Sequence, residues 1–162
     1  MLVNRLDVGL DKELVAINIH LAAFDDGATR QKQVDAVIDY AKREYRQGKY
    51  VLVGGDWNLR LVETDFPHTT TEEDLFWLAD FPKEKIPEGW QLHADYEVPS
   101  VRTLHKAYVS GENYVCTIDG FLLSPNLRCA EIRNLDLSFQ NSDHHPVILV
   151  LEIPTNGDAS ID

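Results

Sequence analysis

Three short stretches of this sequence place acidic, amide or imidazole side chains at the end of a predicted strand. They read Asn-Ile-His-Leu (residues 18–21), Gly-Gly-Asp-Trp-Asn (54–58) and Ser-Asp-His-His-Pro-Val (142–147), and a fourth, Ile-Asp-Gly-Phe (118–121), precedes the last. Cleavage of a phosphoester needs groups of these types: an oxygen that binds a metal, a carboxylate that orients water and an imidazole that transfers a proton. Together the stretches predict a site for that chemistry.

Asp56 and Asn58 follow a predicted buried strand and lie two residues apart, so both can face one cleft. The preceding glycines, Gly54 and Gly55, allow the backbone to turn without steric cost. A carboxylate here can orient or deprotonate a water, and an amide can donate to a phosphate oxygen. An Asx turn that ends the strand explains the pair equally well in isolation. The other motifs favour the catalytic interpretation.

The string at residues 142–147 is the most specific motif in the sequence. Asp143 can bind a divalent metal or hold a neighbouring group, and His144 can hydrogen-bond a phosphate oxygen or act as a general acid or base near neutral pH. The alternative is a polar turn in front of a strand that begins at Pro146.

Asp119 lies within a predicted strand, between Ile118 and Phe121. A carboxylate is costly to bury in such a place without a partner. We expect the partner to be His144, because an Asp fixes the tautomer of an imidazole and raises its basicity. The alternative is a solvated bend residue ahead of Gly120.

Further candidates are less specific. His20 shares a strand face with Asn18 and can protonate a leaving oxygen or contact phosphate, although a lone histidine is more often structural. Arg102 is an isolated cation that can contact a substrate phosphate or pair with a surface acid. We expect three other histidines to be surface residues and the three tryptophans to be packing residues: His68, His93 and His105, and Trp57, Trp77 and Trp90.

The elements that position these residues follow from periodicity. Residues 14–21 alternate with a period of two, which predicts a strand, and residues 2–8 predict a second strand joined to it as a hairpin through residues 9–12. Residues 29–47 carry an apolar stripe at helical spacing, and Gly48 is a stop signal. Residues 50–53 predict a short buried strand.

The second half of the sequence is less regular. Residues 59–99 predict a long elaborated loop with a short helix at 74–81. We expect three further strands, a turn and a disordered tail: strands at 114–124, 128–135 and 147–153, the turn at 125–126, and the tail at 154–162.

The composition bounds the class of protein. The chain has 162 residues, of which 44% are hydrophobic and 26% charged, which predicts one globular domain. The formal net charge of -12 argues against gripping nucleic acid by phosphate neutralisation, but a cation held by carboxylates can still meet a phosphate. No apolar run is long enough to cross a bilayer. Cys116 and Cys129 form neither a zinc motif nor a disulfide scaffold.

In this order, the motifs resemble those of the endonuclease/exonuclease/phosphatase superfamily, the DNase I-like metal-dependent phosphoesterases, over about residues 2–153. The chain is most similar to uncharacterised bacterial members whose motif also reads Gly-Gly-Asp-Trp-Asn. The resemblance implies an α/β (α+β) fold, a four-layer sandwich of two mainly antiparallel sheets with helices outside. It also implies Mg2+- or Mn2+-assisted attack of water on a phosphodiester or phosphomonoester.

The resemblance also assigns roles to residues. It implies that five residues are catalytic: His20, Asp56, Asn58, Asp119 and His144. It implies that Asp143 and Asp56 bind the metal. The side chains expected to contact the substrate phosphate are Asn18, Asn58, Arg102 and His144.

One part of the family pattern is missing. Family members carry an early Asn and then a Glu, the principal metal ligand, well before the His motif, whereas only nineteen residues precede His20 here and Asn4 lies too close to match. We therefore expect residues 1–153 to be the C-terminal part of the domain, with the N-terminal portion missing and one sheet uncovered.

Two functions remain open at this point. One is a phosphoesterase acting on a small molecule, a lipid headgroup or a nucleic acid, alone or with a completing chain or by self-association. The other is a catalytically incomplete fragment or binding module. A cytoplasmic location is the default expectation, since a signal or anchor can lie in the missing portion.

Overall fold

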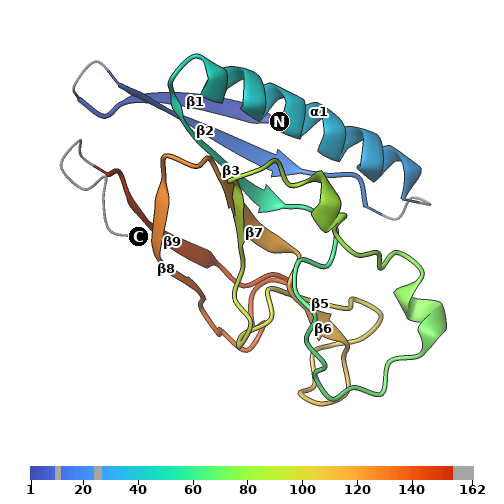
Figure 1. Cartoon of the computed structure of the whole chain (residues 1–162). Helices are drawn as coiled ribbons and strands as arrows, with labels where there is room; N and C mark the ends of the chain where they lie inside the picture. Colours follow the sequence, from blue (N-terminus) through green and yellow to red (C-terminus); the bar gives the residue numbers. More distant parts are fainter. Residues whose placement is uncertain (10–11, 24–26, 155–162) are drawn as a thin grey trace.

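The computed structural model describes residues 1–9, 12–23 and 27–154, and the predicted hairpin forms one side of its main sheet (Figure 1). The five strands of this sheet lie in the order β1-β2-β3-β7-β4. Their bounds are Leu2–Asp7 (β1), Glu13–His20 (β2), Tyr50–Asp56 (β3), Asp119–Leu123 (β7) and Gln91–His93 (β4). β2 and β3 are parallel, and the other neighbours are antiparallel. The α+β fold class expected from the sequence is confirmed.

Helix α1 (Ala28–Arg46) covers one face of this sheet, as Figure 1 shows. Its apolar stripe, which includes Val34 and Ile38, is buried against strand residues such as Val15 and Val53. Each such side chain contributes roughly 1.5–3 kcal/mol through burial. The helix ends at Arg46, two residues before the predicted stop signal Gly48, whose φ of 81° suits glycine and whose N–H donates to the Tyr45 carbonyl at 2.8 Å.

The opposite face of the sheet is only partly covered. A second, two-stranded sheet of β8 (Arg128–Asn134) and β9 (Val147–Glu152) packs over one end, where Leu149 and Leu151 contact the cluster around Leu123. The rest of that face is open, and on β1 the side chains of Leu2 and Leu6, which alternate with the helix-facing residues, are 63% and 50% exposed. Within the described residues, the expected uncovered sheet face is therefore present.

The segment between β3 and β7 differs most from expectation. The helix predicted at 74–81 is wrong, because the structure has only a 3-10 turn, η1 (Glu72–Leu75), which begins just after Thr71. Residues 79–81 are extended instead: Arg60 donates its N–H to the Ala79 carbonyl at 2.8 Å and accepts the N–H of Phe81 at 3.0 Å. Three further elements were not predicted: η2 (Lys83–Lys85), strand β4 and strand β5 (Val101–Arg102).

The strand predicted at 114–124 is divided in two. Its first part, β6 (Val115–Cys116), pairs with β5 (Val101–Arg102) in a separate small sheet, whereas β7 joins the main sheet. The break lies at Thr117 and Ile118, whose carbonyls accept N–H groups from Leu61 and Trp57 instead of continuing one ladder. The predicted turn at 125–126 is present.

The remaining sequence expectations have mixed outcomes. The three tryptophans are buried as predicted. Among the three histidines expected at the surface, only His105 is exposed; His68 packs edge-to-face on Tyr114 with ring centroids 5.0 Å apart, and burial lowers the pKa of the half-buried His93. Both cysteines are free. In the described part of the chain, no helix has the length and apolar character needed to cross a membrane. Residues 10–11 of the hairpin loop and 155–162 of the predicted tail lie outside the described residues.

Candidate active site

Strand register brings three of the predicted site residues into one row at the edge of the main sheet. His20 at the end of β2 is paired with Asp56 at the end of β3, and Asp56 is paired with Asp119 at the start of β7. Oδ2 of Asp56 lies 3.5 Å from Nε2 of His20 and 3.9 Å from Nε2 of His144. Asp56 is thus the centre on which both imidazoles converge.

The two glycines before Asp56 lie within strand β3 and not in a turn, which corrects the sequence-based interpretation. A Cβ on Gly54 would overlap the ring of Phe121 on the adjacent strand. A Cβ on Gly55, whose φ is 134°, would overlap the carbonyl oxygen of Ile19 on β2. The glycines therefore allow neighbouring strands to approach closely and bring Asp56 into register.

The surroundings of Asp56 disfavour its charged form. Burial is the main factor that raises its pKa above the ordinary value of 3.8, and the charge of Asp119 adds to it. The backbone N–H of Asn58 and the histidines His144 and His20 oppose this rise. The site therefore holds negative charge that further positive groups would stabilise.

Asn58 holds Asp56 in place. Its backbone N–H donates to Oδ1 of Asp56 at 2.8 Å, which is the Asx turn considered as an alternative, and its amide donates to the Leu21 carbonyl at 2.9 Å and to Oδ2 of Asp56 at 3.2 Å. Asn58 has a left-handed backbone with φ of 49°, which asparagine tolerates better than most residues. Its predicted contact with phosphate stays a prediction. In this structure, both hydrogen bonds of the amide go to protein oxygens.

Asp119 and His144 are joined as predicted. Nδ1 of His144 lies 2.8 Å from Oδ2 of Asp119. An ionised carboxylate only accepts hydrogen bonds, so Nδ1 carries the proton and Nε2 is directed towards Asp56. Burial opposes the charged ring of His144, but the hydrogen bond and charge of Asp119, with the charges of Asp56 and Asp143, outweigh it and raise the pKa above 6.5.

Sequence reasoning missed several residues that hold the site. His145 is the buried member of the His-His pair: its ring stacks on Phe139 at 3.7 Å between centroids, and its Nδ1 lies 2.9 Å from the Pro99 carbonyl. Arg30 is also buried, and its guanidinium donates to the carbonyls of Asn58 at 2.6 Å and Trp77 at 2.7 Å. Its burial could have been inferred from the sequence, because Arg30 lies one turn before Val34 on the apolar stripe of the helix.

Most of the predicted residues line one cavity of about 280 Å³. Its polar wall consists of His20, Asp56, Asn58, Arg102, Asp143 and His144. The guanidinium of Arg102 donates to the carbonyl of Thr103 at 3.0 Å, and its Nε is buried without a partner among the described residues. The rest of its lining is largely apolar and includes Trp77, Val101, Leu104 and Ile118.

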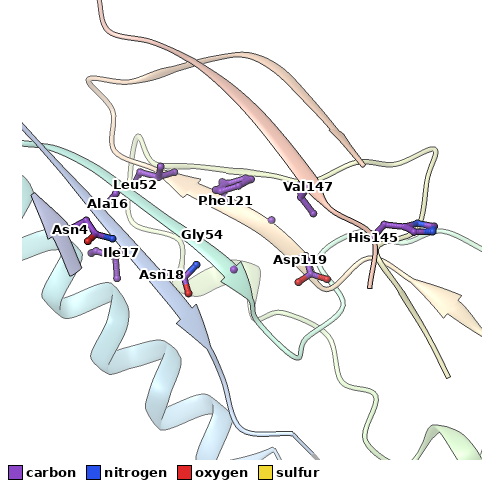
Figure 2. Close-up of a pocket in the computed structure, with 12 residues that line it drawn as sticks. Asn4, Ala16, Ile17, Asn18, Leu52, Gly54, Asp119, Phe121, His145 and Val147 are labelled. Atoms are coloured by element: carbon purple, nitrogen blue, oxygen red, sulfur yellow. The ribbon is translucent and has the colours of Figure 1, made fainter. Parts of the chain in front are cut away.

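Asn18 lies elsewhere. It lines a different cavity, of about 380 Å³, on the open face of the main sheet (Figure 2). In Figure 2, Asn4 and Asn18 lie on the β1–β2 side of this cavity, whereas Asp119 lies at the other side, towards His145. The structure therefore does not bring Asn18 together with the other predicted phosphate-binding residues, and Asp119 borders the open face.

The donor set fits a divalent cation. Of the described residues, Asp56, Asp119 and His144 form a group whose ligand atoms all lie within 4.8 Å of one another. Oδ2 of Asp119 is already committed to hydrogen bonds with His144 and Ser100. Asp56 and Asp143 line the same cavity, and Mg2+ is commonly held by one or two carboxylates together with water. The pKa of Asp56, raised by burial, also indicates charge that a cation would neutralise.

Comparison with known proteins identifies the fold. No family model matches the sequence, and no curated protein matches it. Among solved structures, zebrafish TDP2 complexed with a single-strand DNA product has a TM-score of 0.62 at 16% identity, covering 93% of this chain and 60% of that one. Truncated TDP2 from Caenorhabditis elegans has a TM-score of 0.56 at 17% identity, covering 90% of this chain and 56% of that one.

These likenesses define the class of fold. The chain has the DNase I-like fold of the endonuclease/exonuclease/phosphatase proteins. At identities below 25%, the structural similarity establishes the fold alone. It spans about half the length of the solved structures it matches, for example 43% of a further TDP2 chain from Caenorhabditis elegans.

Proposed function

We propose that this chain carries the catalytic groups of a metal-dependent phosphoesterase, which hydrolyses a phosphodiester or phosphomonoester by activated water. The observation that carries the proposal is the convergence of His20 and the Asp119–His144 pair on Oδ2 of Asp56, inside one cavity. Membership of the endonuclease/exonuclease/phosphatase superfamily, close to its bacterial members with the Gly-Gly-Asp-Trp-Asn motif, is part of this proposal.

Each residue has a role that its geometry supports. Asp56 orients the attacking water and accepts its proton, because its carboxylate lines the cavity and both imidazoles converge on its Oδ2. His144, with Nδ1 held by Asp119, presents Nε2 to the phosphate. His20 lies at the cavity mouth with a side chain that is 73% exposed, where it can protonate the leaving oxygen.

The proposed site also needs groups that bind the phosphate and the metal. Arg102 binds a phosphate oxygen, which is consistent with its place in the cavity lining. Asp56 and Asp143 would hold Mg2+ or Mn2+, which when bound supplies a water of lowered pKa and neutralises phosphate charge. Asn58 supports Asp56, and its proposed contact with phosphate requires a change in its present hydrogen bonds.

The substrate we favour is a small phosphoester with an apolar substituent. Beside the polar groups, the cavity is lined by the apolar side chains of Trp77, Val101, Leu104 and Ile118. The net charge of -12 disfavours a long nucleic acid. A lipid headgroup or a short nucleic acid remains within the proposed substrate class.

One observation favours the alternative, a catalytically incomplete chain or binding module. The open face of the main sheet reaches Asp119, and the second cavity of about 380 Å³ lies there. We propose that a completing chain or a second copy covers this face when the protein is active.

Hydrolysis of bis-p-nitrophenyl phosphate by the purified chain, with Mg2+, Mn2+ or chelator, tests the proposal. We expect metal-dependent turnover that falls by at least about 100-fold in Asp56→Ala and His144→Ala. Full activity in both folded variants would contradict the proposed residues. Absence of turnover in a folded wild-type sample would support the incomplete-chain alternative, and cross-linking would then test for a completing partner.

A further inference from the structure

Ser100 uses the whole hydrogen-bonding capacity of its hydroxyl beneath the candidate site. It is fully buried, at 0% exposure. Its Oγ accepts the backbone N–H groups of Ile118 at 3.0 Å and Asp119 at 3.1 Å. A serine hydroxyl has two acceptor positions and one proton, so the proton is left for Oδ2 of Asp119, at 2.7 Å. The direction of this donation is therefore fixed by the backbone.

The main chain around Ser100 also holds the segment that carries His144. The Ser100 carbonyl accepts the N–H of His145 at 2.7 Å, and the N–H of Arg102 donates to the Asp143 carbonyl at 3.0 Å. Val101 forms a β-bridge with His144 itself. Ser100 thus contacts both sides of the pair: the carboxylate through its hydroxyl, and the histidine segment through its backbone.

We propose that Ser100 is a positioning residue that fixes the carboxylate of Asp119 and, through it, the ring of His144; this rests on the proposed function. Oδ2 of Asp119 receives one hydrogen bond from Ser100 and one from His144, so its side chain is held by two donors. With Nδ1 held in this way, Nε2 stays directed at Asp56. Groups that orient a reacting ligand in this manner are commonly worth about 10- to 100-fold in activity.

The chain offers a matched control in Ser124. This serine is also buried, at 1% exposure, and its Oγ accepts the N–H of Val51 at 2.9 Å and donates to Oδ1 of Asn126 at 2.6 Å. Ser124 lies just after the far end of β7, away from Asp119. Loss of its hydroxyl removes the same kinds of hydrogen bond without touching the candidate site.

The test compares Ser100→Ala, Ser100→Thr and Ser124→Ala in the metal-dependent hydrolysis of bis-p-nitrophenyl phosphate. We expect Ser100→Ala to lower kcat by about 10- to 100-fold with little change in KM, and Ser100→Thr, which keeps the hydroxyl, to recover most of kcat. Ser124→Ala should lose thermal stability but keep its kcat. If Ser100→Ala does not fold, Ser100→Cys takes its place, because it keeps the volume but is a weak hydrogen-bonding group.

A second readout separates this inference from the proposed function. Nitrogen-15 NMR of the neutral His144 ring should show the proton on Nδ1 in the wild type and in Ser124→Ala, and a mixture of tautomers in Ser100→Ala. An unchanged ring in Ser100→Ala, or an equal loss of kcat in Ser124→Ala, would overturn the inference. If the wild type shows no turnover, the proposed function fails while the ring signals still decide the role of Ser100.

Discussion

Asp119 and His144 are 25 positions apart in the sequence, yet their side chains meet at 2.8 Å between Oδ2 and Nδ1. The contact forms because β7 starts at Asp119 beside β3, while the bridge between Val101 and His144 brings the 142–147 segment to the same edge of the sheet. The pairing fixes which nitrogen of His144 remains for chemistry. Protonation of that ring is the first property to test.

We predict that His144 titrates above pH 6.5 in the wild type with chelator present, and below its wild-type value in Asp119→Asn. Burial disfavours the imidazolium, and the hydrogen bond and charge of Asp119 are the main factors that overcome it. Removal of that charge leaves the burial cost in place. Proton NMR of the ring as a function of pH measures both values. An equal or higher pKa in Asp119→Asn would contradict the prediction.

The same shifts predict the sign of a pH effect on stability. His144 has a folded-state pKa raised above 6.5, so its stabilising contribution is complete below pH 6.5 and is lost as pH rises through the raised value. Asp56 has a folded-state pKa raised above 3.8, so its contribution is complete below pH 3.8 and is lost above the raised value. Above the raised pKa of Asp56, its charged carboxylate therefore favours the fold less than the protonated form does.

A second prediction follows for Asp56→Asn. Removal of a buried charge should increase the free energy of unfolding at pH 7.5 by about 0.5–2 kcal/mol, as at many functional sites. The gain should shrink below pH 3.8, where the wild-type carboxyl is protonated. Mg2+ should raise the thermal midpoint of the wild type and have little effect on Asp56→Asn. Thermal unfolding with Mg2+ or chelator tests this, and equal responses of the two proteins to Mg2+ would contradict it.

Much of this site was predictable because local patterns carry it. The alternation around Asn18 and His20 predicts their strand, and the cost of burying Asp119 without a partner predicts its contact with His144. Periodicity alone does not show that His145 is buried, because its burial depends on packing against Phe139. Likewise, the alternation places Asn18 and His20 on one strand face, yet the two residues line different cavities. Periodicity along a single strand does not report this separation.

The failed helix at 74–81 has a long-range cause. Local sequence signals predict a helix here, but tertiary contacts favour an extended segment: the backbone of Arg60 pairs with residues 79–81, and Phe81 packs on Trp57 at 5.2 Å between ring centroids. Ser100 was missed for the same reason, because its partners Asp119 and His145 are distant in sequence. Positioning groups of this kind depend on tertiary contacts, which periodicity does not report.

A third prediction concerns Gly54 and Gly55, whose substitution by Ala should differ in kind. Gly54→Ala should cost about 1–3 kcal/mol, because the new methyl group meets the ring of Phe121, which borders the open cavity and can move. Gly55→Ala should cost more, because it combines a backbone clash with Ile19 and a φ of 134°. Chemical denaturation of both variants measures the difference.

Phe121→Ala provides the control for this pair. The double variant Gly54→Ala with Phe121→Ala should be less destabilised than the sum of the single changes, by about 0.5–3 kcal/mol. Gly55→Ala should show no such coupling, because its methyl group meets backbone atoms. Additive effects in the first pair would show that the ring of Phe121 does not determine the need for glycine at position 54.

A fourth prediction concerns the apolar side chains that line the cavity, Leu104 among them. Leu104 is 61% exposed, yet it borders the cavity that holds Asp56 and His144. In a series of p-nitrophenyl alkyl phosphodiesters, kcat/KM should rise with alkyl length up to about fourfold per methylene, the value for full burial. The rise should flatten in Leu104→Ser but persist in Leu6→Ser, which changes an exposed leucine on β1. If kcat/KM does not rise with alkyl length in the wild type, these apolar side chains do not bind the substituent. If the rise is retained in Leu104→Ser, the alkyl group binds at another surface.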